Sequence, residues 1–177
     1  MTKWEIDPKH SEIHFRAKHM LISTVTGLFT KFEGTVDTLE PNDFVQASIH
    51  LSIDVDSVYT NESYRDEHLK SSAFFDVDKH PYITFRSTEL SKDDDNASTF
   101  VLRGMLDIKD MVKEVQFHVS FGGTAEENGR LKAGFQVSGI INRKHFGLTY
   151  NPLMEAGGMV VSEEIELAAN IELIKIS

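Results

Sequence analysis

Apolar and polar residues alternate with a period of two along much of this 177-residue chain. The stretch 45–54, for example, places Val45, Ala47, Ile49 and Leu51 between polar neighbours. Because successive side chains of a strand point to opposite faces, such a stretch predicts a strand with one dry and one wet face. The same alternation recurs at 12–19, 100–108, 115–121, 133–140 and 164–173.

Turn-forming residues separate these stretches. They cluster at Pro41–Asp43, at Asp93–Asn96, from Gly122 to Gly129, and from Asn151 to Gly158. Gly, Pro, Asn and Asp favour tight turns, so we expect most consecutive strands to form antiparallel hairpins.

One segment has a helical pattern. Asn61 is a suitable N-cap for a helix through ESYRDEHLK, in which Asp66 and Lys70 are four residues apart. About eight strands with a single dry face, plus one short helix, fit either a two-sheet sandwich or a closed barrel. The alternation alone does not choose between them.

Composition excludes several classes of function. Lys and Arg number 18 against 28 for Asp and Glu, and the formal net charge of −10 disfavours nucleic acid and anionic lipid surfaces. No cysteine is present, which excludes disulfides, thiolate ligands and thiol redox chemistry. No signal peptide or long apolar run is evident, so we expect a cytoplasmic protein without stable membrane insertion, or a periplasmic one if a signal peptide was removed.

The stretch YRDEHLKSSAFFDVDKHPYITF concentrates charged and aromatic residues. If its second half is extended, Asp76, Asp78 and His80 face the same way, as a metal site would require. A fourth ligand is not evident, and Pro81 favours an extended His80, so we interpret the segment as a solvated loop.

Histidines offer the other candidate chemistry. His14, His50 and His118 alternate with apolar residues and are expected on wet faces. His19 continues a dry face, where it is either a hydrogen-bonded histidine at a strand end or a contact for the polar head of a ligand. No Gly-x-Ser-x-Gly elbow or His-Glu-x-x-His pair occurs in the chain.

The segment RDEHLKSSAFFDVDKHPYITFRST closely resembles the signature of the YceI-like family, polyisoprenoid-binding proteins with a lipocalin-like barrel. The resemblance continues, in order, through WEIDPKHSEIHFRAKHM, GLFTKFEGTV, LRGMLDIKDMVKEV and INRKHFGLTYN. Two departures are the turn Lys109-Asp110, where the family commonly has a glycine, and His145, where an acidic residue is usual. The second departure would alter the mouth of a barrel.

The resemblance implies one all-β domain over residues 1–177: an antiparallel, lipocalin-like closed barrel of about eight strands with one short helix. It implies an interior that holds a long apolar lipid, such as a polyisoprenoid, an isoprenoid quinone or a fatty-acid derivative, and a homodimer. Arg65, Asp66 and His68 would then belong to a helix packed on the barrel, in a structural role.

We therefore expect non-enzymatic binding, storage or transport of such a lipid, with no catalytic residue, metal or other cofactor. The alternatives are an enzyme that uses His19, His145 or the segment 76–80, and a stress-related structural protein whose barrel is filled by side chains. The small residues Ala47 and Gly104 are expected to leave room inside. The expected lumen lining is Phe15, Ala17, His19, Phe32, Val36, Ala47, Ile49, Leu51, Phe74, Phe75, Phe85, Leu102, Gly104, Leu106, Phe117, Val119, Phe135, Val137 and Phe146.

Overall fold

The structure is a computed structural model that describes residues 1–93, 96–151 and 161–177. Its strands form one antiparallel sheet, and one short α-helix and three 3-10 turns complete the described elements. The elements are β1 (Thr2–Ile6), η1 (Pro8–His10), β2 (Glu12–His19), β3 (Ser23–Phe29), β4 (Phe32–Thr38), β5 (Ser48–Asp54), η2 (Val55–Ser57), β6 (Val58–Tyr59), α1 (Ser63–Lys70), β7 (Tyr82–Asp93), β8 (Asn96–Ile108), β9 (Met111–Glu127), β10 (Arg130–Asn142), η3 (Arg143–Phe146) and β11 (Glu164–Lys175).

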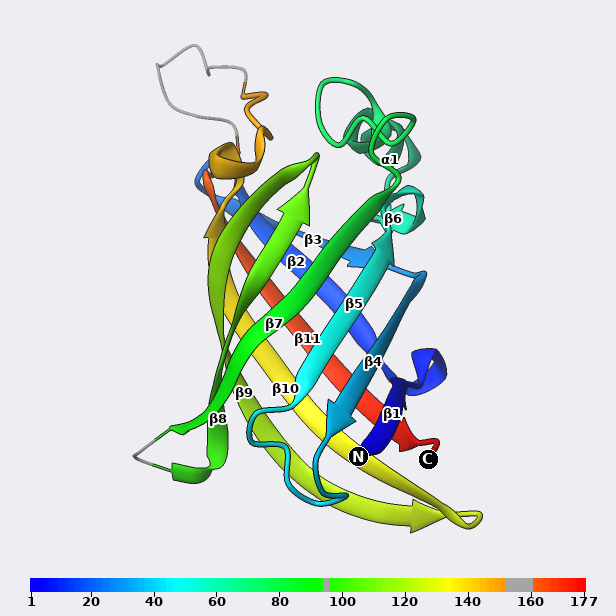
Figure 1. Cartoon of the computed structure of the whole chain (residues 1–177). Coiled ribbons are helices and arrows are strands. Elements are labelled where there is room, and N and C mark those ends of the chain that lie inside the picture. The colour runs from blue at the N-terminus through cyan, green and yellow to red at the C-terminus, as the bar shows by residue number, and fades with distance from the viewer. Residues whose placement is uncertain (94–95, 152–160) are drawn as a thin grey trace.

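The sheet closes on itself because β1 pairs with β11 as well as with β4. β1 and β2 both pair with the same edge of β11, one after the other, so together they occupy one strand position. β4 pairs with β1 and β3 pairs with β2, so β4 and β3 occupy the next position. β5 and β6 are likewise two halves of one long strand. The barrel therefore has eight strand positions connected up and down, which confirms the predicted fold class (Figure 1).

The period-two alternation becomes the inside and outside of this barrel. On β11 the apolar residues Ile165, Leu167, Ala169, Ile171 and Leu173 face the interior, where they pack against the buried core. A barrel has no free strand edge, so all the dry faces of the chain are buried together. Within the described residues, no helix is long and apolar enough to cross a membrane.

Two expected element boundaries are wrong. The strand predicted to begin at Val45 begins at Ser48, because Gln46 is left-handed (φ 62°) and Ala47 N donates to Phe44 O in a turn. β9 runs through Gly122 and Gly123, and the turn of the β9–β10 hairpin is confined to Asn128-Gly129. The predicted turn at 93–96 lies partly, and that at 151–158 largely, outside the described residues.

The predicted helix is present, but its expected start is wrong. The N-cap is Glu62, whose carboxylate accepts from the backbone of the first turn, whereas Asn61 is left-handed (φ 63°). Asp66 does not pair with Lys70. It accepts instead from the backbone N of Thr60 at 2.7 Å and from the Thr60 hydroxyl, which fixes the helix to the strand before it.

Candidate functional site

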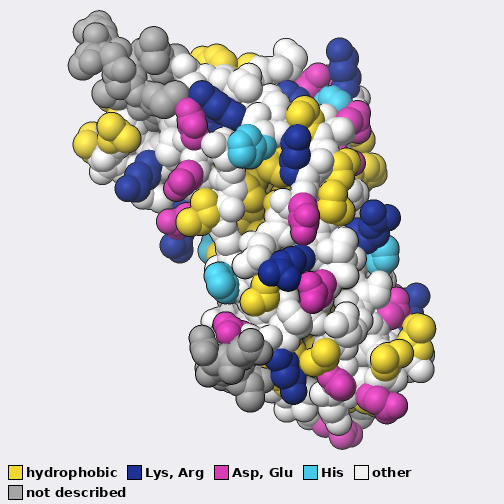
Figure 2. All heavy atoms as spheres, turned by 60° about the vertical axis from the view of Figure 1, so that its left-hand side comes forward, with side chains coloured by type: hydrophobic (Ala, Val, Ile, Leu, Met, Phe, Trp, Pro, Cys, Tyr) yellow, Lys and Arg dark blue, Asp and Glu magenta, His cyan; other side chains and the backbone are white. Residues whose placement is uncertain are grey.

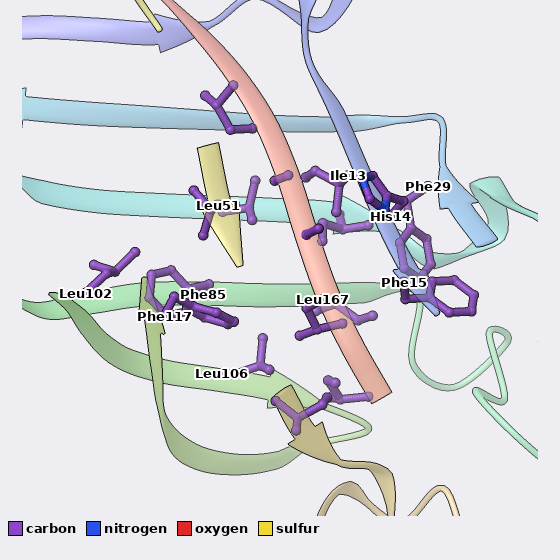
Figure 3. Close-up of a pocket in the computed structure, with 18 of the residues that line it drawn as sticks. Ile13, His14, Phe15, Phe29, Leu51, Phe85, Leu102, Leu106, Phe117 and Leu167 are labelled. Atoms are coloured by element: carbon purple, nitrogen blue, oxygen red, sulfur yellow. The ribbon is translucent and has the colours of Figure 1, made fainter. Parts of the chain in front are cut away.

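The barrel encloses a cavity of about 280 Å³. All its lining residues are apolar except His14, Thr35, His50 and Arg143. His14, Thr35 and His50 alternate along their strands with residues that face the interior, so their own side chains belong to the outer face of the barrel wall. Figure 3 shows phenylalanine and leucine side chains from several strands converging on this space. The cavity can therefore exclude water and accept apolar groups.

The cavity is long relative to its volume. On β11 its lining runs from Ile165 to Leu173, eight residue steps. At about 3.3 Å per step this spans roughly 26 Å along the strand. A space of this length and small volume is narrow, a shape that suits a chain better than a compact molecule.

The structure places most of the predicted lumen residues on the cavity wall: Phe15, Ala17, Val36, Ile49, Leu51, Phe74, Phe75, Phe85, Leu102, Leu106, Phe117, Val119, Phe135 and Val137. His19, Phe32, Ala47, Gly104 and Phe146 are not among its lining residues.

These five residues lie elsewhere for separate reasons. Ala47 belongs to the turn before β5, and its side chain is buried outside the cavity. His19 is the last residue of β2, where it bridges to Val161. Phe32 and Phe146 are buried in the core, on β4 and in η3. The expectation that Gly104 leaves open room inside is wrong, because a phenylalanine ring already fills that space.

Glycines allow phenylalanine rings to lie flat against the wall. A Cβ at Gly104 would lie 2.4 Å from Phe85 Cζ, and one at Gly27 would lie 2.1 Å from Phe15 Cζ. A third such glycine, Gly139, lies under the ring of Phe117. The rings thus occupy space that a side chain would take, and the lumen keeps its width.

An aromatic cluster fills the end of the barrel near the chain termini. Phe44, from the β4–β5 connection, packs against Trp4 of β1, Phe121 of β9 and Phe135 of β10, with ring centroids 5.3, 5.5 and 4.9 Å apart. Trp4 is fully buried and its indole N–H donates to the hydroxyl of Thr38 at 3.3 Å. Phe44 thus reaches from the β4–β5 connection across the barrel to β9 and β10 at this end.

The opposite end, which we call the α1 end, is covered by α1 and the segments beside it (Figure 1). The His68 ring lies 5.2 Å from Phe74 and 4.9 Å from Tyr150, and Phe74 lies 5.0 Å from Tyr150. Leu69 of α1 lines the cavity, and so does Phe74, which follows the helix. The expected placement of His68 in a helix packed against the barrel is thus seen, with aromatic contacts as its role.

Arg143 organises the α1 end from within. Its guanidinium donates to the backbone carbonyls of Ser162, Leu148, Tyr150 and Val161, at 2.9, 2.6, 2.9 and 3.3 Å. The side chain is 2% exposed, and burial lowers the pKa of the guanidinium. Four carbonyl oxygens compensate this buried charge, so Arg143 holds two chain segments together over the cavity.

Arg65 and Asp66 have the structural role expected of them. The Arg65 guanidinium donates to Thr60 Oγ1 at 2.8 Å and to Thr60 O at 2.6 Å, and Asp66 accepts from the same residue. These bonds connect α1 to the residue that follows β6, and neither Arg65 nor Asp66 is among the residues that line the cavity.

The residues of the enzyme alternative do not form one site. His145 is exposed in η3. The segment 76–80 is a turn and not extended, since Asp76 is left-handed (φ 52°) and its carbonyl accepts from the backbone N of Lys79 and of His80. The expectation of an extended segment, in which Asp76, Asp78 and His80 would face the same way, is therefore wrong.

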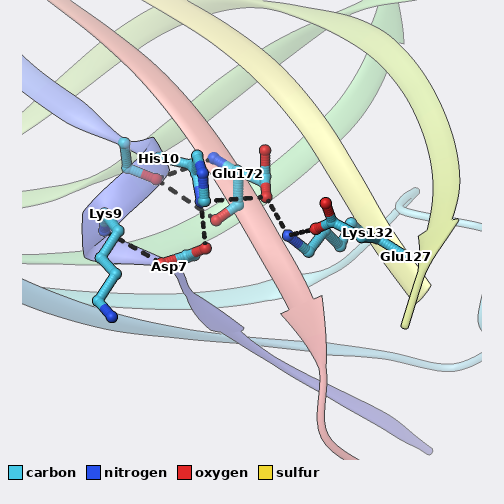
Figure 4. Close-up of polar contacts among 7 residues, drawn as sticks. Asp7, Lys9, His10, Glu127, Lys132 and Glu172 are labelled. Carbon is cyan, nitrogen blue, oxygen red and sulfur yellow. Dashed lines mark hydrogen bonds and ion pairs between the residues drawn. The ribbon is translucent and has the colours of Figure 1, made fainter. Parts of the chain in front are cut away.

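A polar cluster outside the barrel escaped the sequence analysis (Figure 4). His10 Nδ1 lies 2.7 Å from Asp7 Oδ2 and 3.7 Å from Glu172 Oε1, and Lys132 Nζ lies 2.9 Å from the same Glu172 oxygen. The hydrogen bond to Asp7 raises the pKa of His10, and that bond lowers the pKa of Asp7. The side chains of Asp7, His10 and Glu172 have ligand atoms close enough to one another for a metal ion. The ammonium of Lys132 already compensates Glu172, and the arrangement is that of a hydrogen-bonded ion-pair network.

Sequence reasoning missed the lining residues that come from turns and the helix. Phe44, Leu69, Leu148 and Val161 all line the cavity but lie outside the alternating strands. Isolated apolar residues in connections carry no periodic signal, so only the three-dimensional structure identifies them.

Comparison with known proteins decides the family. The sequence model of the YceI-like domain matches residues 4–173. The chain belongs to the YceI-like family. UPF0312 proteins of Staphylococcus epidermidis and Staphylococcus aureus are 33% and 32% identical to it over 174 residues, which is 97% of both chains in each case.

Several solved structures have the same fold. The Campylobacter jejuni YceI protein is 28% identical, with a TM-score of 0.76 over 90% of both chains. BcnA of Burkholderia cenocepacia, 21% identical, has a TM-score of 0.78 over 94% of this chain and 98% of its own. A polyisoprenoid binding domain of Saccharophagus degradans, 16% identical, has a TM-score of 0.68 over 98% of both chains.

Proposed function

We propose that this YceI-like protein binds one long apolar lipid inside its barrel, as a carrier or store and not as an enzyme. The observation that carries the proposal is the narrow apolar cavity, whose lining spans roughly 26 Å of β11. Burying a methylene is worth about 0.8 kcal/mol, so contact along a chain supplies affinity without any polar anchor.

Among long apolar chains we favour a polyisoprenoid or the tail of an isoprenoid quinone, with a fatty-acid derivative as the alternative of the same flexible kind. A branched, flexible chain can follow a channel between phenylalanine and leucine side chains, while a rigid fused-ring lipid needs a wider one. The polyisoprenoid binding domain of Saccharophagus degradans has the same fold, which supports the same ligand class. The wall itself discriminates weakly between chains, since one methylene changes binding in an apolar pocket by only about 1–3 kcal/mol.

The cavity also bears on the two alternatives. A purely structural barrel would fill its interior with side chains, whereas here glycines keep phenylalanine rings against the wall. For an enzyme, the histidines and carboxylates named as candidates would have to meet at the cavity. His19 and His145 are not among its lining residues, and neither are Asp76, Asp78 and His80.

Native mass spectrometry of protein purified from cells that make isoprenoids tests this function. We expect a one-to-one adduct, and organic extraction should release a molecule with a long hydrocarbon chain. Delipidated protein should take up an isoprenoid quinone in the same ratio. Bare protein in every preparation, together with no uptake of quinone, isoprenoid alcohol or fatty acid, would refute the proposal.

A further inference from the structure

The connection between β2 and β3 exposes three consecutive apolar side chains. Met20, Leu21 and Ile22 are 42%, 68% and 86% exposed. They make up the whole connection, because His19 pairs with Ser23, and Ile22 N donates to His19 O at 3.2 Å. Single exposed apolar residues are common on protein surfaces, but three in a row at a hairpin tip do not serve the fold.

The backbone of this turn makes the choice of residues more unusual. Met20 and Leu21 are both left-handed, with φ of 53° and 61°. Such turns favour Asn, Asp and Gly, because other side chains crowd the backbone in this region. The turn between β9 and β10 has the favoured pair Asn128-Gly129, and the turn between β8 and β9 has Lys109-Asp110, whose side chains are polar. Met-Leu is thus disfavoured by both solvent and backbone, which points to a role outside folding.

The hairpin lies at the α1 end of the barrel, beside the cavity (Figure 1). His19 bridges to Val161, a lining residue, and Ser162 N donates to Lys18 O at 3.0 Å. Arg143 bonds the carbonyls of Val161 and Ser162 from within. Figure 2 shows hydrophobic side chains protruding at this end of the molecule.

Near its tip the hairpin has no acidic residue of its own. Residues 13–32 contain Arg16, Lys18 and Lys31 but no Asp or Glu, although the formal net charge is −10. Glu166 lies beside Arg16 across the β2–β11 pair, so Lys18 is the cation nearest the tip. Ser162, which lies beside Lys18, is followed by Glu163, which pairs with Lys144 at 2.8 Å, and by the exposed Glu164. The attraction to a lipid surface therefore comes mainly from the three apolar side chains of the tip.

A lipid surface fits these features better than a protein partner. A stable protein interface buries about 800 Å² on each side, far more than three side chains on a turn provide. A bilayer needs no matching surface, and each apolar side chain gains by leaving water for the boundary between headgroups and acyl chains.

We propose that the tip Met20–Ile22 inserts into the interfacial layer of a lipid bilayer, with Lys18 facing anionic headgroups. The α1 end of the barrel then meets the membrane, where lipid enters or leaves the cavity. The docking is reversible, because three apolar side chains provide a peripheral anchor only. This inference rests on the proposed function, since a lipid carrier must meet the membrane that supplies its ligand.

The test uses flotation with phosphatidylcholine vesicles that contain phosphatidylglycerol. The informative variant is Met20→Asn with Leu21→Gly, which installs the pair found at Asn128-Gly129. We expect vesicle partitioning to fall by about tenfold or more, while the thermal midpoint stays equal or rises. The matched control is Leu39→Ser, which removes an apolar side chain that is 72% exposed after β4, near the opposite end.

The outcomes separate the two proposals. Loss of vesicle binding and slower lipid transfer from vesicles, with unchanged affinity for a water-soluble short-chain isoprenoid, supports the docking tip. The docking tip is overturned if the parent protein does not bind vesicles, or if Leu39→Ser reduces vesicle binding as much as the turn variant does. A dimer that dissociates in the turn variant without any vesicle binding also overturns it, because the tip then meets a second copy. Failure to take up any isoprenoid would count against the proposed function instead.

Discussion

At the scale of single residues, phenylalanine rings lying over glycines set the width of the cavity. The glycine at 27 accepts the ring of Phe15, and Gly104 accepts that of Phe85. The two sites differ, since an added Cβ at Gly104 would also meet the backbone oxygen of Arg86 at 2.5 Å. A ring can swing into the lumen, but backbone cannot move as easily.

Gly27→Ala is therefore the cleanest way to narrow the cavity. The three atoms nearest the new methyl group all belong to the Phe15 ring, which should turn into the lumen. We expect lipid affinity to fall about tenfold, a size typical of a misfit in an apolar pocket, with little change in folding stability. Quinone titration beside urea unfolding of delipidated protein measures both.

Gly134→Ala is the matched control, because a Cβ there meets nothing within 4 Å. It should leave affinity unchanged. If Gly27→Ala lowers stability but leaves affinity per folded molecule intact, the rings do not set the width of the lumen.

Ala47→Phe, by contrast, should overpack the core and lower folding stability by about 1–3 kcal/mol, because Ala47 is buried outside the cavity.

The pair Asp7–His10 predicts how stability depends on pH. A raised histidine pKa stabilises the folded state below the ordinary value of 6.5, and this is lost as pH rises through the folded pKa. The lowered pKa of Asp7 stabilises above 3.8 and is lost as pH falls through its folded pKa. The pair therefore stabilises most between these two ordinary values.

His10→Gln should reveal this window. The denaturant midpoint of the variant should fall below that of the parent at about pH 5, and the difference should shrink at about pH 9. His118→Gln, an exposed histidine on β9, is the control and should show no such change. An equal deficit for His10→Gln at both pH values would mean that the ion pair is not its cause.

At the scale of elements, Arg143 joins the segment after β10 to the start of β11. Replacing it with Met would leave carbonyl oxygens without donors and cost about 3 kcal/mol of folding stability. The neighbouring Lys144 is the control, since its ion pair with Glu163 at 2.8 Å is partly exposed and Lys144→Met should cost less than about 1 kcal/mol. Urea unfolding compares the two, and equal costs would contradict the account of Arg143.

Elements with an unbroken dry face could be predicted from the sequence, and those with interruptions could not. β10 and β11 follow their alternating stretches closely. β1 and β2 occupy one strand position that is interrupted by η1. The interruption occurs because Asp7 is the N-cap of η1, where its carboxylate accepts from the backbone N of Lys9, and Pro8 begins this turn. The spacing of Asp66 and Lys70 predicts helix α1, but the sequence suggests a cap one residue early because Glu62 is a less usual N-cap than Asn61.

At the scale of the molecule, closure of the barrel depends on contacts between the chain ends. Trp4 pairs with Lys175, and Ile6 with Leu173. Alternation is local and does not specify such pairing, so it left sandwich and barrel equally open, and the resemblance to the YceI-like family decided between them. The wall of the cavity followed from the dry faces. Its ends did not, because Phe44, Leu69 and Leu148 come from connections and the helix.

The central claim is that the interior of the barrel holds an apolar chain along its length. The most direct measurement is the affinity of delipidated protein for a series of isoprenoid alcohols of increasing chain length. We expect one ligand per chain and an affinity that rises with each added isoprene unit until the cavity is filled, then levels off. An affinity that is independent of chain length, or absent throughout the series, would contradict it.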